Sequence, residues 1–249
     1  MKQGFIIPVY RHLTTVGAVA EKLAGFNLPI IIVDDGNGPE ANALLKNLTA
    51  KIPSAVLVSL KKNLGKGGAF IKGLEKATEL GLTHVFQIDA DGQHDTERAA
   101  FFLEESARNP DKIICGYPVF DETAPKYRVT GRKISNFWTA VTSLSLEYKD
   151  ALCGFRIYPV VQTLHITKNP LIDKRMGFDT EILVRLNWRG VYPLFYPIKV
   201  NYPEDGISNF RMVNDNLRIS LVFTRLSAGL LIRLPLLLAR KLQRRKKTI

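Results

Sequence analysis

Four short apolar runs in the first 90 residues constrain the fold of this chain more than any other feature of its sequence. In order, they lie at residues 4–10, 29–35, 55–60 and 83–88. Helix-like stretches at about 14–25 and 66–80 lie between them. Short apolar strands that alternate with helices are typical of a parallel sheet covered on both faces. The sequence therefore predicts an α/β domain with a Rossmann-like, mostly parallel sheet and helices on both faces.

The second and fourth apolar runs end in paired carboxylates, which indicate a ligand site. Asp34 and Asp35 end the second run, and Asp89 and Asp91 follow the fourth. Ligands of open parallel sheets bind at the carboxyl ends of the strands. Side chains two apart on an extended chain point the same way, so Asp89 and Asp91 can reach one divalent cation. Mg²⁺ or Mn²⁺ fits such a site, with His94 hydrogen-bonded beside it.

Four alternatives to a metal site of this kind can be considered from the sequence. A calcium-binding EF-hand loop beginning at Asp89 would need glycine at position 6 and glutamate at position 12, where the chain has His94 and Ala100. A dinucleotide-binding glycine fingerprint is absent after the first run, and the chain has no Gly-x-x-x-x-Gly-Lys-Ser/Thr loop. An Asp-x-Asp pair in a surface loop without function remains an alternative.

A glycine cluster, Gly65-Lys66-Gly67-Gly68, opens the second helix-like stretch. Backbone amides at the start of a helix can bind a phosphate together with a lysine side chain. Alternatively, these glycines allow the helix to pack closely against its neighbours. The pattern alone does not distinguish the two roles.

These motifs, in this order, resemble those of the family 2 glycosyltransferases with the GT-A fold. The resemblance covers about residues 4–210 and is strongest to the branch that includes dolichol-phosphate mannose synthase and related polyprenyl-phosphate sugar transferases. The matching segments are Pro8-Val-Tyr, Val33-Asp-Asp-Gly, Asn63-Leu-Gly-Lys-Gly-Gly-Ala, Asp89-Ala-Asp-Gly-Gln-His, Asp150-Ala-Leu-Cys-Gly-Phe-Arg, Gly177-Phe-Asp-Thr-Glu and Gly206-Ile-Ser-Asn-Phe. The second half is also similar to bacterial envelope transferases.

The resemblance implies four groups of site residues. A nucleotide-sugar donor would bind to Pro8, Tyr10, Asp34, Asp35, Lys66, Asp89 and Gln93, with Mg²⁺ or Mn²⁺ held by Asp89, Asp91 and Gln93. Asp91, Asp150 and Arg156 would be catalytic, and Arg132, Arg156 and Ser208 would contact the acceptor or its phosphate. One departure weakens the expectation of a polyprenyl-phosphate acceptor: Tyr117 stands where this branch usually has an arginine.

The implied reaction breaks the bond between a sugar and a diphosphate, where a bound cation neutralises the departing charge. The acceptor attacks the opposite face and inverts the anomeric centre. A phosphate acceptor is already ionised and needs no general base. A hydroxyl acceptor needs a carboxylate, and we rank Asp150 before Asp179 and Glu181 for this role. A loop hydrogen bond is the alternative role for Asp150.

The C-terminal segment carries most of the net charge of +12. Residues 216–249 contain nine lysines or arginines and no acid, so residues 1–215 carry only +3 (12 minus 9). We predict a catalytic domain over 1–215 and an amphipathic, basic helix over 216–249, bent near Pro235. At 100° per residue, five of its arginines fall within about 100° of one another. They are Arg218, Arg225, Arg233, Arg240 and Arg244.

This arginine face is expected to meet the phosphates of an anionic membrane surface. Charges interrupt the segment too often for the roughly 20 apolar residues of a spanning helix. The density of leucines disfavours nucleic acid, and packing against a partner protein is the remaining alternative. Two cysteines and no signal peptide indicate a reducing cytosolic environment. The expected location is therefore cytoplasmic and peripheral, on the inner face of the cell membrane.

The sequence thus predicts an inverting, metal-dependent hexosyltransferase that uses a nucleotide-sugar donor and a lipid-linked or membrane-delivered acceptor. The expected context is the synthesis of cell-envelope glycolipid or polysaccharide. Two other classes of protein remain. One is a non-catalytic membrane-surface or scaffold protein that retains the nucleotide-binding fold. The other is a nucleotidyltransferase, which should carry a basic glycine-rich loop after the first strand, where this chain has none.

Overall fold

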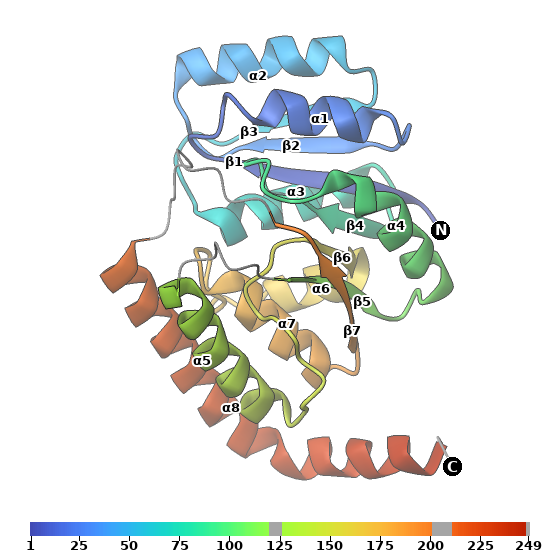
Figure 1. Cartoon of the computed structure of the whole chain (residues 1–249), viewed down its shortest axis with the longest axis vertical. Helices are drawn as coiled ribbons and strands as arrows, with labels where there is room; N and C mark the ends of the chain where they lie inside the picture. Colours follow the sequence, from blue (N-terminus) through green and yellow to red (C-terminus); the bar gives the residue numbers. More distant parts are fainter. Residues whose placement is uncertain (120–125, 201–210, 248–249) are drawn as a thin grey trace.

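A seven-stranded sheet lies at the centre of the computed structural model, which describes residues 1–119, 126–200 and 211–247 (Figure 1). Its strands, in the order β3-β2-β1-β4-β6-β5-β7, are β1 (Gln3–Val9), β2 (Ile30–Asp34), β3 (Ala55–Ser59), β4 (His84–Gln87), β5 (Ile113–Pro118), β6 (Arg156–Pro159) and β7 (Pro193–Ile198). Strands β1 to β4 pair in parallel, as do β5 and β7. Only β6 runs antiparallel to its neighbours among the described strands. The mostly parallel α/β fold predicted from the sequence is confirmed.

Helices cover both faces of the sheet. They are α1 (Val16–Ala24), α2 (Pro39–Lys51), α3 (Lys66–Glu79), α4 (Ala99–Arg108, after the 3₁₀ turn η1, Thr96–Arg98), α5 (Lys126–Ser143), α6 (Val160–Thr167), α7 (Phe178–Trp188) and α8 (Met212–Lys247). Helices α1 and α3 match the predicted stretches to within two residues. Helix α2 was not predicted, because few of its side chains are buried and its apolar pattern is weak.

The alternation of side chains along β1 and β2 explains why these strands are apolar throughout. Phe5 and Ile7 join a core beneath α1 and α4, whereas Ile6 joins a second core beneath α3, α6 and α7. Ile30 and Ile31 are divided in the same way. Both faces of these strands are therefore buried, as parallel strands between two helical layers require.

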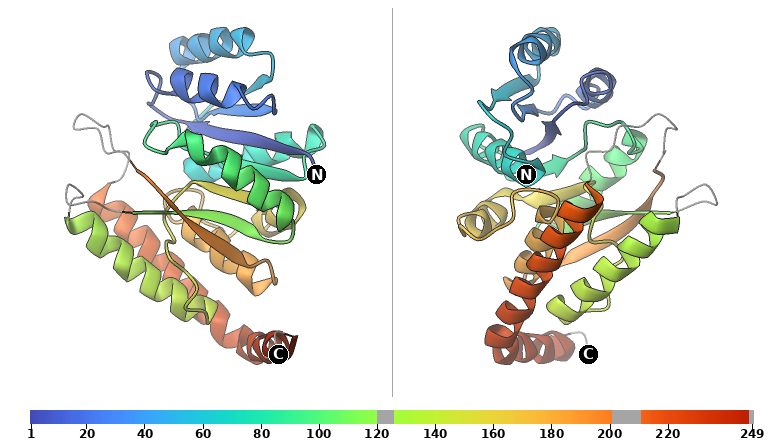
Figure 2. Two further views of the ribbon diagram at one scale, coloured as in Figure 1. Left: turned by 45° about the vertical axis from the view of Figure 1, so that its right-hand side comes forward. Right: turned by 90° about the vertical axis from the view of Figure 1, so that its left-hand side faces the viewer.

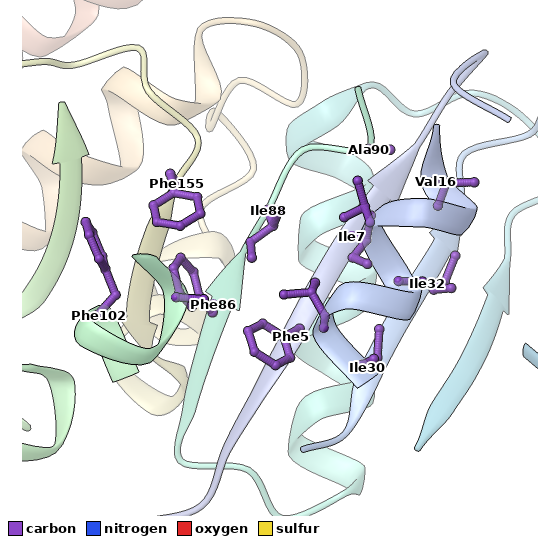
Figure 3. Packing of buried hydrophobic residues seen from close by; sticks show 14 of the residues in the cluster. Phe5, Ile7, Val16, Ile30, Ile32, Phe86, Ile88, Ala90, Phe102 and Phe155 are labelled. Atoms are coloured by element: carbon purple, nitrogen blue, oxygen red, sulfur yellow. The ribbon is translucent and has the colours of Figure 1, made fainter. Parts of the chain in front are cut away.

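Stacked phenylalanines connect the first core to the carboxyl end of β4 (Figure 3). The rings of Phe86 and Phe155 are 4.6 Å apart in an edge-on contact, and Phe86 also stacks on Phe5 at 5.8 Å. Phe155 then contacts the ring of His94 at 5.3 Å. The loop that carries His94 is thus packed directly on the core.

Helices α5 and α8 lie side by side, at the end of the molecule away from α1 and α2 (Figures 1 and 2). A third apolar cluster joins α8 to α7, with Trp188 and Val184 packed against Phe223 and Leu226. Helix α8 begins at Met212, four residues before the predicted segment, and contains Pro235. It changes direction in its last third (Figure 1). This agrees with the predicted bend, since proline breaks the hydrogen-bond pattern of a helix.

Candidate active site

The predicted carboxylates lie at one edge of the sheet, because β1, β2 and β4 are parallel neighbours whose carboxyl ends coincide. Asp34 is the last residue of β2, and Asp35 follows it. Asp89 and Asp91 come two and four residues after the end of β4. The shared edge expected from the sequence is therefore present, and the two pairs differ in what they contact.

The first pair, Asp34 and Asp35, shapes the loops at this edge. Both residues are buried. Asp34 accepts hydrogen bonds from Asn37 and Asn42. Asp35 accepts three hydrogen bonds from residues 63–65, just before α3, and burial raises the pKa of its carboxyl group. These carboxylates hold the loop that presents the start of α3, and their predicted contact with the donor remains a prediction.

Lys66, the first residue of α3, lies between two carboxylates. Its Nζ atom is 2.9 Å from Asp89 Oδ1 and 2.8 Å from Asp179 Oδ2, at the start of α7. Gln87 Nε2 donates to the other oxygen of Asp179 at 3.2 Å. Burial alone would lower the pKa of Lys66, but the charges of Asp179 and Asp89 raise it overall. Lys66 is therefore a fixed positive charge at the edge of the sheet.

The glycine of the Gly-Phe-Arg segment makes room for this ion pair. A Cβ atom on Gly154 would lie 2.5 Å from Lys66 Nζ and 2.7 Å from Asp89 Oδ2. A side chain at position 67 is excluded for a different reason, because a Cβ atom there would lie 2.5 Å from Cβ of Phe178. The glycine at position 67 is thus explained by close packing of α3 on α7.

Gly154→Ala is expected to displace the Lys66–Asp89 pair while the fold is retained, because the nearest atom is the end of a flexible lysine. The displaced ammonium would no longer lie where a diphosphate can reach it at the start of α3. We therefore expect nucleoside diphosphate binding to weaken by roughly tenfold, about 1.4 kcal/mol. Calorimetric titration with UDP and with GDP measures this, and the melting temperature checks the fold. Gly17→Ala is the control, since nothing lies within 4 Å of its added Cβ. Unchanged affinity in Gly154→Ala would show that the position of the Lys66 ammonium does not matter for nucleotide binding.

The Asp-x-Asp turn presents Asp91 beside Asp89. Asp91 Oδ1 accepts a hydrogen bond from the backbone of Gln93 at 3.0 Å, which closes the turn. His94 Nδ1 is buried and has no hydrogen-bond partner among the described residues. Within the same residues, no three His, Cys, Asp or Glu side chains come together to hold a metal ion by themselves. Two carboxylates fit Mg²⁺ or Mn²⁺ when substrate oxygens and water complete the shell.

Asp150 holds a turn, which was the alternative role for this residue. Its Oδ1 atom accepts from the backbone of Leu152 at 2.9 Å and of Cys153 at 2.6 Å. Its Oδ2 atom is 2.6 Å from Nη1 of Arg132 on α5. Both oxygens are occupied and the residue is 2% exposed, so this geometry disfavours its predicted role as a base. The contact instead positions Arg132 near the edge of the sheet.

Arg156 is fully buried, and its predicted roles in catalysis and toward the acceptor stay predictions. Its guanidinium donates to the backbone carbonyl of Asp179 at 2.6 Å and to that of Asp150 at 3.4 Å. It therefore joins two site segments from behind. Asn136, which the sequence did not single out, has a similar role, because its Oδ1 atom accepts from Ala151 N at 2.9 Å.

Glu181 is also fully buried, which disfavours its predicted role as a general base. Its Oε1 atom accepts from Arg185 of the same helix at 2.6 Å. Its Oε2 atom accepts from the backbone of Asp173 at 2.7 Å and from Arg225 of α8 at 3.2 Å. This carboxylate connects α7 to α8 through Arg225.

The remaining predicted residues either follow or lie within β1 and the Asp-x-Asp turn, or lie outside the residues that the structure describes. Pro8 is opposite Val33 in the sheet, and Tyr10 follows β1 with Arg11 over its ring at 5.1 Å. Their predicted contacts with the donor, and that of Gln93, remain predictions. Ser208 lies outside the described residues. No test of its acceptor role follows from the structure.

Four of the predicted arginines of α8 contact the protein, although Arg218, Arg225 and Arg233 remain exposed, so their predicted contact with lipid stays a prediction. The contacts are Arg218 with Asp173, Arg225 with Glu181, and Arg233 and Arg240 with Trp188. The side chain of Arg244 lies outside the described part. Apolar side chains of α8 are exposed as well, with Leu231 72% and Ile232 80% exposed. The most apolar 18-residue window within residues 212–243 has a mean hydropathy of 1.7, so this helix is long and apolar enough to cross a membrane, a test that core helices also pass.

The sequence profile of Glycosyl transferase family 2 matches residues 5–165. The chain belongs to this family and is a glycosyltransferase. It is 26% identical over 215 residues to the UDP-N-acetylglucosamine--dolichyl-phosphate N-acetylglucosaminyltransferase of Methanococcus voltae, a match that covers 80% of this chain and 85% of the relative. It is 25% identical over 219 residues to the polyprenol monophosphomannose synthase of Mycolicibacterium smegmatis, with 86% and 82% covered.

The fold is similar to that of glucosyl-3-phosphoglycerate synthase from Mycobacterium tuberculosis, crystallised with Mn²⁺ and UDP-glucose. The TM-score is 0.62 at 15% sequence identity, and the match covers 93% of this chain and 78% of that chain. At this identity the likeness concerns the fold alone. It agrees with the GT-A architecture that the sequence resemblance implied.

Proposed function

We propose that this glycosyltransferase moves a sugar from a nucleotide-sugar donor to a polyprenyl-phosphate or other lipid-linked acceptor, with a divalent metal and with inversion. The observation that carries the proposal is the charged edge of the sheet, where Lys66 pairs with Asp89, and Asp91 follows two residues later in the same turn. Relatives that the chain resembles over most of its length are named for transfer to dolichyl phosphate and for polyprenol monophosphomannose synthesis. In this proposal, residues 1–215 hold the catalytic site and 216–249 contact the membrane in cell-envelope synthesis.

The donor would lie across the carboxyl ends of β1, β2 and β4, with its diphosphate near Lys66. Asp89 and Asp91 would hold Mg²⁺ or Mn²⁺, with Gln93 beside them, and the metal would offset charge on the diphosphate. Lys66 supplies a further positive charge at the start of α3, where backbone amides also favour an anion. Nothing in this arrangement resembles the basic loop after β1 that a nucleotidyltransferase should carry.

A phosphate acceptor suits the carboxylates of this site better than a hydroxyl acceptor does. Asp150, Asp179 and Glu181 are each paired with a cation in the structure. A paired carboxylate is a poor base, because the cation stabilises its ionised form. A phosphate brings its own charge to the anomeric carbon, and Arg132 lies on α5 to attract it. This supports an acceptor that carries a phosphate despite Tyr117.

A lipid-linked acceptor also suits the exposed apolar surface of α5 and α8. The exposed side chains of α5 recur at helical spacing, and those of α8 follow its whole length. They are Ile134, Phe137, Trp138 and Val141 on α5, and Leu217, Leu221, Leu231, Ile232, Leu236 and Leu242 on α8. We propose that this surface enters the cytoplasmic leaflet, with the basic end of α8 near anionic headgroups.

Leu231→Gln with Ile232→Gln is expected to weaken binding to vesicles that contain anionic lipid by at least about tenfold. Each side chain can gain roughly 1.5–3 kcal/mol when it leaves water, and both are exposed in the free protein, so folding should change little. Co-sedimentation measures the binding. Leu44→Gln, an equally apolar change on exposed α2, is the control. This design is better than removal of 216–249, which would uncover Trp188 and Val184. Equal sedimentation of all three proteins would contradict the membrane role.

The donor and metal can be tested without an acceptor. Calorimetric titration with UDP-, GDP- and TDP-sugars, with and without Mn²⁺, should find one nucleotide class that binds and whose affinity rises with Mn²⁺. An affinity for the nucleotide sugar that does not change with Mn²⁺ would remove the metal from the proposal. No binding of any nucleotide sugar by the folded protein would favour a non-catalytic scaffold.

A further inference from the structure

The proposed metal ligand Asp89 is already occupied by a cation that belongs to the protein. Lys66 Nζ lies 2.9 Å from Oδ1 and 3.0 Å from Oδ2 of Asp89, so the ammonium faces both carboxylate oxygens. The two side chains are 18% and 24% exposed. A divalent ion that binds Asp89 needs the same oxygens and is repelled by the adjacent ammonium.

We propose that Lys66 and the metal compete for Asp89, and that a bound diphosphate relieves the competition by drawing the ammonium away from Asp89. The inference rests on the proposed metal and donor site and adds an order of binding. In the free protein the metal binds weakly because Lys66 occupies its ligand. In the nucleotide complex the lysine is paired with phosphate, and Asp89 is available to the metal.

Asp179 allows this exchange without loss of the lysine from the site. Its Oδ2 atom is 2.8 Å from Lys66 Nζ, and the residue is held by Gln87 and, through its backbone carbonyl, by Arg156. Lys66 can therefore leave Asp89 while it stays tied to Asp179. The ammonium is at the end of a flexible stem in the first turn of α3, where an incoming diphosphate also meets backbone amides.

The proposal predicts opposite effects of one substitution on two ligands. In Lys66→Met, the free protein should bind Mn²⁺ at least about tenfold more tightly than wild type, because Asp89 has lost its competitor. The same variant should bind UDP or GDP, whichever wild type binds, at least about tenfold more weakly without metal. Electron paramagnetic resonance of unbound Mn²⁺ and calorimetry with each nucleotide measure the two affinities. Lys72→Met on the exposed surface of α3 removes an equal charge and should change neither.

The outcomes separate this inference from the proposed function. Equal or weaker Mn²⁺ binding by Lys66→Met would overturn the proposed competition. The loss of a lysine with a merely structural role would weaken the binding of Mn²⁺ and of nucleotide together. If the variant does not fold, the Mn²⁺ affinity of the wild-type protein is measured with and without UDP or GDP. This affinity should rise strongly when the nucleotide is present, and no rise would overturn the proposal. Absence of Mn²⁺ binding even with nucleotide would instead remove the metal from the proposed function.

Discussion

Asp91→Asn is expected to lower the rate of sugar transfer by roughly 10³-fold or more, which corresponds to about 4 kcal/mol in the activation barrier. The substitution removes the charge that would hold the metal beside the diphosphate, and it keeps an oxygen that can accept the hydrogen bond from Gln93. That local bond is the one the structure gives to the Asp91 side chain. The fold should therefore be retained.

The control for Asp91→Asn is Asp95→Asn, four residues later, where the carboxylate caps η1 through Glu97 N. Initial rates at saturating Mn²⁺, with the melting temperature as a check of folding, measure the effect. Transfer by Asp91→Asn at a rate near that of Asp95→Asn would show that the metal site has been placed on the wrong residues.

Glu181→Gln is expected to lower the free energy of unfolding by about 2–3 kcal/mol, more than any other substitution described above. The charge of a buried carboxylate disappears while Arg185 and Arg225 remain beside it. Breaking a fully buried ion pair costs about 3–5 kcal/mol, and the partial exposure of Arg225 reduces this. Urea denaturation measures the change.

Two comparisons distinguish this structural role of Glu181 from a role in catalysis. Glu79→Gln breaks an exposed pair with Lys76 and should change stability by less than about 1 kcal/mol. At a temperature where the Glu181→Gln variant is folded, its turnover should stay within a few fold of wild type. Full stability with turnover abolished would restore Glu181 as a candidate base.

The sequence predicted those parts of the fold that depend on local patterns. The apolar runs predicted the strands β1 to β4. The polar residues that end these runs predicted the edge of the sheet on which Asp34 and Asp89 both lie. These signals are local because side chains alternate along a strand and because parallel strands end at the same edge. The position of Gly154 against Lys66 is different. It depends on residues that are far apart in the chain, and no spacing indicates it.

The contacts of Arg156, Glu181 and the α8 arginines could not be predicted from the sequence, for one physical reason. A charged residue in a motif can line a site or support it from behind, and only its burial and partners distinguish the two. The spacing of arginines on α8 correctly placed them on one face. It could not show that Glu181 and the carbonyl of Trp188 would draw that face toward the protein.

Detection of a glycolipid product tests the central claim most directly. The purified protein would be incubated with vesicles that contain undecaprenyl phosphate or dolichyl phosphate, Mn²⁺ and the nucleotide sugar that binds best. The account predicts a polyprenyl-phosphate sugar by mass spectrometry, with an anomeric configuration opposite to that of the donor by NMR, and none with Asp91→Asn. Release of nucleotide and free sugar without any glycolipid, or a product that retains the configuration of the donor, would contradict it.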